Sequence, residues 1–343
     1  MDRLERAKIR FQVVTPIFIG NGEDYTQEEY WITGGTLHLL RQDQVVEMAE
    51  KVGLYRELLT SAEDFHQLQN FYRRLFQRVP VEKVSWRKIG GDPRILEELQ
   101  RNSTRGVQQF IKDSFWGTPI IPGSSLKGAI RTALLSYLVQ KFGLPSLVVQ
   151  EENFKKRARK LEGFYFCGSN KGRFIPQQDI LKALSISDLK PLSFETRVIN
   201  PTNRPYRKPK DNKIPVVIEG LIRGEFEGEI GIDRGLIERD RNLAGNPYFQ
   251  ETPLSLQLIK DTLNQFYSTI LERENNRFRV TPLQYSQFLV KIGRFGGAGS
   301  KSVEEYRQVF IRQLKKNLPY QLSIWIDTQG RPFGWGRLQF LPS

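Results

Sequence analysis

Residues 120–135 are the run whose residue types best suit phosphate chemistry, because a proline–glycine step and two serines precede a helix with two cations. Ser124 or Ser125 is a natural N-cap, and Lys127 and Arg131, four residues apart, share one helical face. The start of a helix offers free backbone N–H groups, which together with hydroxyls and cations suit a phosphate. The segment predicts a phosphate-binding helix start, with an ordinary capped helix and solvated cations as the alternative.

A second run, residues 293–302, is rich in glycine and follows an alternating strand. Glycines let the backbone approach a phosphate or a ribose without interference from a Cβ atom. The glycine spacing fits neither a P-loop nor a dinucleotide fingerprint, and a flexible hinge is the alternative. The candidate binding residues are Arg294, Gly296, Gly297, Gly299, Ser300 and Lys301.

Most of the positive charge lies in residues 153–213, which carry +10 of the net charge of +14. The two densest clusters are residues 155–160 and 203–213, and prolines in the second predict an exposed, mobile loop. A charge run is usually a solvated face, yet neighbouring aromatic rings such as Tyr206 offer stacking surfaces. We therefore keep three further candidates for phosphate contact: Arg204, Arg207 and Lys208.

The 343 residues are 39% hydrophobic, which predicts a globular chain with a sizeable core. The basic excess favours a polyanionic partner, nucleic acid first. With one cysteine, Cys167, and two histidines, no disulfide framework and no zinc site are expected. The charged start of the chain resembles no signal peptide, and no stretch has the length of a membrane span, so we expect a cytoplasmic protein that binds no membrane.

Residues able to do catalysis are few. We expect His38 at a surface position of a strand and His66 within a helix, both structural. Glu23 and Asp24 follow a glycine turn, where an acid could assist RNA cleavage or hold a metal, although such acids are common in turns. No catalytic residue, metal or cofactor is therefore assigned.

Alternating apolar residues predict strands near residues 9–13, 226–232, 288–292, 321–326 and 337–341, and a hairpin over 30–39. Apolar stripes predict helices over 44–59, 62–78 and 253–272. This mixture fits an α+β fold of ferredoxin-like (RNA-recognition-motif-like) type, in two such units. The expected division is residues 1–150, with a helical insertion over 40–115, then a basic connecting segment over 151–213 and a second half over 214–343.

Four motifs, in this order, resemble the RAMP superfamily of type III CRISPR effector complexes: residues 15–22, 121–128, 185–188 and the late glycine-rich loop. Within that superfamily the chain is most similar to the subtype III-A subunit that caps the 3′ end of the CRISPR RNA in the Csm complex. The motifs run from one end of the chain to the other, but residues 40–115 and 140–172 match none of them. Phe18 stands where the first motif often has histidine, so no imidazole acts there.

The resemblance implies a non-catalytic subunit of antiviral defence that binds the guide RNA by its backbone and ends the filament of backbone RAMP subunits. Its implied partners are CRISPR RNA, backbone RAMP subunits, other subunits of the complex and host nucleases of guide maturation. Ser124, Ser125, Lys127, Arg131 and the glycine-rich loop would line the RNA path. The alternative is a RAMP endoribonuclease that processes guide RNA or cleaves target RNA; Asp24 matches the catalytic acid of the backbone-forming relatives only loosely.

Overall fold

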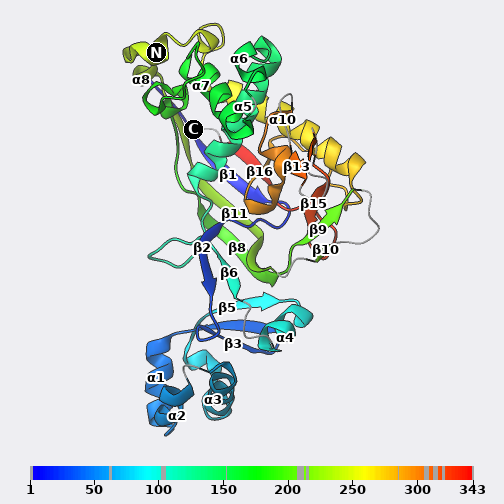
Figure 1. The fold of residues 1–343 in the computed structure, drawn as a ribbon. Coiled ribbons are helices and arrows are strands. Elements are labelled where there is room, and N and C mark those ends of the chain that lie inside the picture. The colour runs from blue at the N-terminus through cyan, green and yellow to red at the C-terminus, as the bar shows by residue number, and fades with distance from the viewer. Residues whose placement is uncertain are drawn as a thin grey trace.

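The computed structural model describes residues 3–61, 64–101, 106–151, 153–206, 212–213, 216–284, 286–304, 309–311, 316–318 and 321–341. Most of the strands in these ranges join one mixed sheet of eleven strands. Helices pack against this sheet and extend the molecule at both ends (Figure 1). The expected α+β class is confirmed.

The centre of the sheet is a single ferredoxin-like unit. Its strands have the spatial order β16-β1-β11-β8, and each neighbouring pair is antiparallel. A strand–helix–strand–strand–helix–strand order along the chain gives this arrangement. The elements are β1 (Leu4–Val13), α5 (Gly123–Phe142), β8 (Lys190–Ile199), β11 (Val217–Asp233), α10 (Leu256–Arg277) and β16 (Trp335–Leu341).

The pattern of β1 explains its central place. Ile9, Phe11 and Val13 alternate with more exposed residues and are buried in the main core, together with side chains from α5 and α10. The tip of the Phe11 ring lies against Gly336 of β16, where a Cβ atom would come 2.0 Å from the Phe11 Cζ atom. Glycine at position 336 therefore leaves the space that the Phe11 ring fills between the first and last strands of the unit.

Residues between β1 and α5 build a lobe at one end of the molecule (Figure 1). We expected a helical insertion, but the lobe also contributes strands to the large sheet. Gly53, with φ +74°, ends α1, so the helix expected over 44–59 is two helices. The elements are β2 (Gly20–Tyr25), β3 (Tyr30–Thr33), β4 (Thr36–Leu40), α1 (Gln42–Lys51), α2 (Tyr55–Ser61), α3 (Phe65–Arg78), η1 (Val81–Lys83), β5 (Ser85–Gly91), α4 (Pro93–Arg101) and β6 (Val107–Phe110).

The basic stretch contains helix and strand in its described part, and β9 pairs with β15 and β10 in a separate three-stranded sheet. The exposed loop expected over 203–213 lies partly outside the described residues, because residues 207–211 are not described. The elements around it are α6 (Ser146–Val149), α7 (Phe154–Cys167), η2 (Pro176–Gln178), η3 (Ile180–Ala183), β7 (Leu184–Ile186), β9 (Thr202–Pro205) and β10 (Asn212–Lys213).

The remaining elements follow β11 in the chain and complete the fold. They are α8 (Arg234–Arg239), α9 (Arg241–Ala244), η4 (Pro247–Phe249), β12 (Leu289–Lys291), η5 (Arg294–Gly296), η6 (Ala298–Ser300), β13 (Val309–Ile311), β14 (Lys316–Leu318) and β15 (Ser323–Ile326). The division at residues 150 and 213, with a second ferredoxin-like unit, stays a proposal; β1 from the first segment pairs with β11 and β16 from the last.

None of the helices in the described ranges combines the length and the apolar character that crossing a membrane requires.

Candidate functional site

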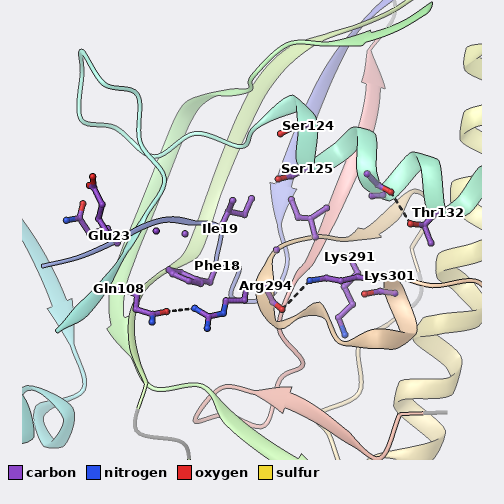
Figure 2. A pocket seen from close by; sticks show the side chains of 18 of the residues that line it. Phe18, Ile19, Glu23, Gln108, Ser124, Ser125, Thr132, Lys291, Arg294 and Lys301 are labelled. Carbon is purple, nitrogen blue, oxygen red and sulfur yellow. Dashed lines mark hydrogen bonds between the residues drawn. The ribbon is translucent and has the colours of Figure 1, made fainter. Parts of the chain in front are cut away.

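A cavity of about 610 Å³ opens where three of the sequence motifs meet. Its walls are the loop after β1 with the strand β2, the first half of α5 and the glycine-rich loop, and β6 closes one side (Figure 2). Ser124, Ser125, Arg294, Ser300 and Lys301 all line it, so the structure brings these predicted residues together.

The face of α5 that lines the cavity carries small residues. Ser124, Ser125, Gly128 and Thr132 all face the opening, and a Cβ atom at Gly128 would meet no other atom within 4 Å. The two serines were predicted from the sequence, but Gly128 and Thr132 were missed. The spacing of small residues at 124, 128 and 132 is the signal that could have found them, because residues four apart share a helical face.

The start of α5 differs from the expected serine cap. The residue before the helix is Pro122, and no side chain of the helix caps it. Instead, Asp188, a distant residue, accepts a hydrogen bond from the Gly123 N–H at 2.8 Å. The cap prediction for Ser124 or Ser125 was therefore wrong. This hydrogen bond also joins the 121–128 motif to the 185–188 motif.

Lys127 and Arg131 share a helical face, as expected, but it is not the face that lines the cavity. The Lys127 ammonium donates to the Leu184 carbonyl at 2.7 Å, and burial lowers the pKa of this ammonium. Arg131 contacts Asp179 and Glu162, and its guanidinium lies 4.8 Å from the centre of the Phe166 ring. Both cations therefore have partners inside the protein, and the phosphate-binding group expected from spacing is split between two faces.

The glycine-rich loop lies opposite α5 and is held in a defined shape. Gly293, at φ +87°, has no room for a Cβ atom, which would lie 2.5 Å from the Phe18 carbonyl oxygen. The Gly299 N–H donates to Gln321 at 2.8 Å, and the Ser300 hydroxyl donates to the Gly296 carbonyl at 3.0 Å. Gly296, Gly297 and Gly299 shape this loop and do not themselves line the cavity.

Two cations of the loop point toward the cavity wall. Arg294 donates to the Gln108 side chain at 2.7 Å, and the Lys301 ammonium donates to the Arg294 carbonyl at 3.2 Å (Figure 2). Burial lowers the pKa of Lys301, and the nearby Lys291 and Arg294 charges lower it further. An anion placed here would relieve this repulsion, which makes Lys301 suited to contact a phosphate.

Phe18 joins the first loop to the glycine-rich loop. Its side chain is buried against Phe110 and Phe295, and its carbonyl accepts the Arg294 N–H at 2.8 Å. The Phe18 ring, which stands where the first motif often has histidine, therefore contributes to packing. Neither Phe18 nor Gln108 was among the predicted site residues.

The two acids that the sequence places after a glycine turn, Glu23 and Asp24, lie on the strand β2 and not in a loop. They line the same cavity, and the Asn21 side chain donates to Glu23 at 3.0 Å. Within the described ranges, no group of three or more histidine, cysteine, aspartate or glutamate side chains could hold a metal ion.

Other candidates lie away from the cavity. His38 is only 4% exposed, so its predicted surface position was wrong, because β4 is covered on both faces. Arg204 lies on β9 and contacts the Arg279 carbonyl. Arg207 and Lys208 fall outside the described residues. Cys167 is buried, and burial raises the pKa of its thiol.

The two glycines of α5 give a matched test of how the helix is positioned. A Cβ atom at Gly123 would lie 2.2 Å from the Ile186 carbonyl oxygen, whereas Gly128 has open space. We expect Gly123→Ala to lower the free energy of unfolding by about 1–3 kcal/mol. Gly128→Ala should raise it by roughly 0.5–1 kcal/mol, because alanine is the better helix former. Urea denaturation measures both, and equal effects would contradict this packing.

Comparison with known proteins identifies the family to which the chain belongs. Residues 10–314 match the family described as RAMPs, the RAMP superfamily. The chain is 29% identical over 300 residues to the CRISPR system protein Csm5 of Methanocaldococcus jannaschii, a match that covers 84% of this chain and 68% of the relative.

Two solved structures share the fold at 19% sequence identity. One is a chain of a cryo-EM structure of a Csm–crRNA–target RNA ternary complex from a type III-A CRISPR–Cas system, with a TM-score of 0.72 over 97% of this chain and 100% of that chain. The other is the crystal structure of Csm5 from T. onnurineus, with a TM-score of 0.68 over 96% and 99%.

Proposed function

Because the chain belongs to the RAMP superfamily, we propose that it is a subunit of a type III-A CRISPR effector complex that holds the backbone of the guide RNA in the cavity. The resemblance seen in the sequence motifs is confirmed at the level of the superfamily and of similarity to Csm5. The finer assignment is that the chain binds the 3′ region of the guide and ends the filament of backbone subunits.

The observation that carries this proposal is the pairing of a small-residue helix face with a glycine-rich loop across one cavity. Small residues on both walls let a sugar–phosphate chain approach the protein backbone closely. Serine hydroxyls on one wall and the Arg294 and Lys301 cations on the other supply donors for phosphate oxygens. Such donors bind the repeating backbone of RNA whatever its bases are, which suits a guide whose sequence varies.

The proposed partners are CRISPR RNA, the backbone RAMP subunits and the other subunits of the complex. Support comes from the Csm–crRNA–target RNA complex, one chain of which shares this fold. Contact with host nucleases that mature the guide stays a prediction.

Filling the cavity should displace the RNA without unfolding the protein. We expect Gly128→Trp, in the assembled complex, to leave only the 3′ region of the guide open to nuclease digestion, because the indole occupies the space for the backbone. Affinity of the purified chain for single-stranded RNA should fall roughly tenfold, about 1.4 kcal/mol. Gly128→Ala is the matched control and should protect the guide normally. Full protection with tryptophan at 128 would contradict the proposed path.

Two double variants test whether the RNA contacts the cavity or the opposite face of α5. We expect Arg294→Ala/Lys301→Ala to weaken binding to all RNA sequences alike. The slope of log affinity against log salt concentration should also become shallower, by roughly 0.7 for each phosphate that these two cations bind. Lys127→Ala/Arg131→Ala removes interactions within the protein and should lower the thermal midpoint instead. Salt titrations by fluorescence anisotropy measure the slopes. If the salt dependence of RNA affinity changed only in Lys127→Ala/Arg131→Ala, the RNA would lie on the face of α5 that carries Lys127 and Arg131.

A nuclease is the second candidate, because Glu23 and Asp24 lie at the rim of the proposed RNA path. We propose that the chain is non-catalytic and expect end-labelled RNA to stay intact during long incubation with Mg²⁺ or Mn²⁺. Cleavage that disappears in Asp24→Asn, while RNA affinity is kept, would contradict this and assign Asp24 a catalytic role.

A further inference from the structure

A second hollow, which we call the aromatic groove, lies between β5, β8 and the loop of residues 111–120 that joins β6 to α5. It measures about 450 Å³ and shares no lining residue with the cavity. Figure 1 shows this loop projecting from the body beside β2 and β6. The groove is lined by Trp86, Arg87, Lys88, Gly90, Trp116, Gly117, Thr118, Phe194, Glu195, Thr196 and Arg197.

Large aromatic rings are unusually exposed here. Trp86 is 43% exposed, Trp116 71% and Phe194 41%, and Phe115, beside Trp116 in the loop, is 81% exposed. Each such ring can bury roughly 150–250 Å² when it is covered. Rings gathered in this way mark a binding surface, whereas single exposed apolar residues do not.

Hydrogen bonds around Asp113 order the backbone of the loop that carries the exposed rings. The Asp113 carboxylate accepts the backbone N–H groups of Phe115 and Trp116, both at 2.9 Å, and these bonds lower the pKa of Asp113. The Asp113 backbone closes the turn through bonds with Thr118 and Gly117 at 2.8 and 2.9 Å. Gly117, at φ +64°, lies over the Trp86 ring. The aromatic side chains are thus presented by an ordered backbone, which reduces the entropic cost of binding.

Cations stand between the rings. Arg87 donates to Thr196 at 2.8 Å and also contacts Glu219, so its guanidinium is fixed 6.0 Å from the centre of the Phe194 ring. Lys88 pairs with an exposed acid, Glu82, at 3.2 Å. Arg197 forms no ion pair with any residue in the described ranges, and Glu195 is the acid among the lining residues. Three cations and one acid thus line the groove beside the rings, and two of the cations, Arg87 and Lys88, pair with acids outside the lining.

We propose that the aromatic groove binds single-stranded nucleic acid through its unpaired bases, which stack on Trp116 and Trp86 while Lys88 and Arg197 contact phosphates. Alternating aromatic rings and cations are how sequence-tolerant single-strand sites work. A protein partner would also cover aromatic rings, but the excess of cations beside them favours a polyanion. This site is separate from the proposed guide path and does not depend on it.

The test uses the full chain carrying Gly128→Trp, so that binding in the cavity does not mask the groove. The probes are a 12-residue oligouridylate, the same oligomer without bases, and the corresponding oligothymidylate. Trp116→Ala should weaken oligouridylate binding about tenfold, because it removes a ring on which a base stacks. Trp116→Phe, which keeps a ring, should bind nearly normally. The oligomer without bases should bind the parent protein and Trp116→Ala equally weakly. The oligothymidylate should lose affinity in Trp116→Ala as the oligouridylate does, because base stacking needs no 2′-hydroxyl.

Photocrosslinking places the contact directly. A 5-iodouridine oligomer should crosslink to the peptide that contains Phe115 and Trp116, and the yield should fall in Phe115→Ala as well. Two outcomes overturn the proposal. One is unchanged oligouridylate affinity in Trp116→Ala together with no crosslink in the groove. The other is loss of a neighbouring subunit from the purified complex with RNA affinity intact, which would make the groove a protein interface.

Discussion

The contact between Gly123 and the backbone of residues 186–188 determines how the rest of the site is arranged. A helix can start this close to another strand only without a Cβ atom, and the Asp188 carboxylate satisfies the N–H group that this approach would otherwise bury. The contact fixes the rotation of α5 about its axis. Ser125, Gly128 and Thr132 consequently line the cavity, whereas Lys127 and Arg131 are directed to Leu184, Asp179 and Glu162.

The opposite wall of the cavity is fixed by backbone contacts as well. The loop after β1 and the glycine-rich loop come from opposite ends of the chain, yet the Phe18 carbonyl accepts the Arg294 N–H, and Gly293 leaves room for that carbonyl. The buried Lys291–Glu274 pair and the Trp335 indole, which donates to Glu274 at 3.0 Å, lie beneath the loop. Walls held in this way change little from one ligand to another, as recognition of a repeating backbone requires.

Sequence patterns predicted the parts of the fold that follow from local rules. Alternation located β1 and β11, and glycine content located the loop at 293–302. Spacing also placed Lys127 and Arg131 on one helical face correctly. Spacing could not say which face meets the cavity. That depends on Asp188 and Asp179, which lie 65 residues after Gly123 and 48 residues after Arg131, respectively. The predicted surface position of His38 was wrong for a similar reason. An alternating pattern predicts a strand with one face exposed to solvent, but Leu37–Leu40 of β4 are buried on both faces.

The buried Glu219 carboxylate ties the cavity to the aromatic groove. It contacts Arg87 of β5, Lys112 at 3.0 Å and the Tyr25 hydroxyl at 3.0 Å, and its side chain is fully buried. Two cations share one carboxylate, so a positive charge remains in the interior, and burial lowers the pKa of Lys112. Removing one member of such a cluster leaves buried charges uncompensated, so its members stabilise the fold together. Arg87 of the cluster lines the aromatic groove, and Tyr25 directly follows Asp24 of the cavity, so the cluster connects the two surfaces.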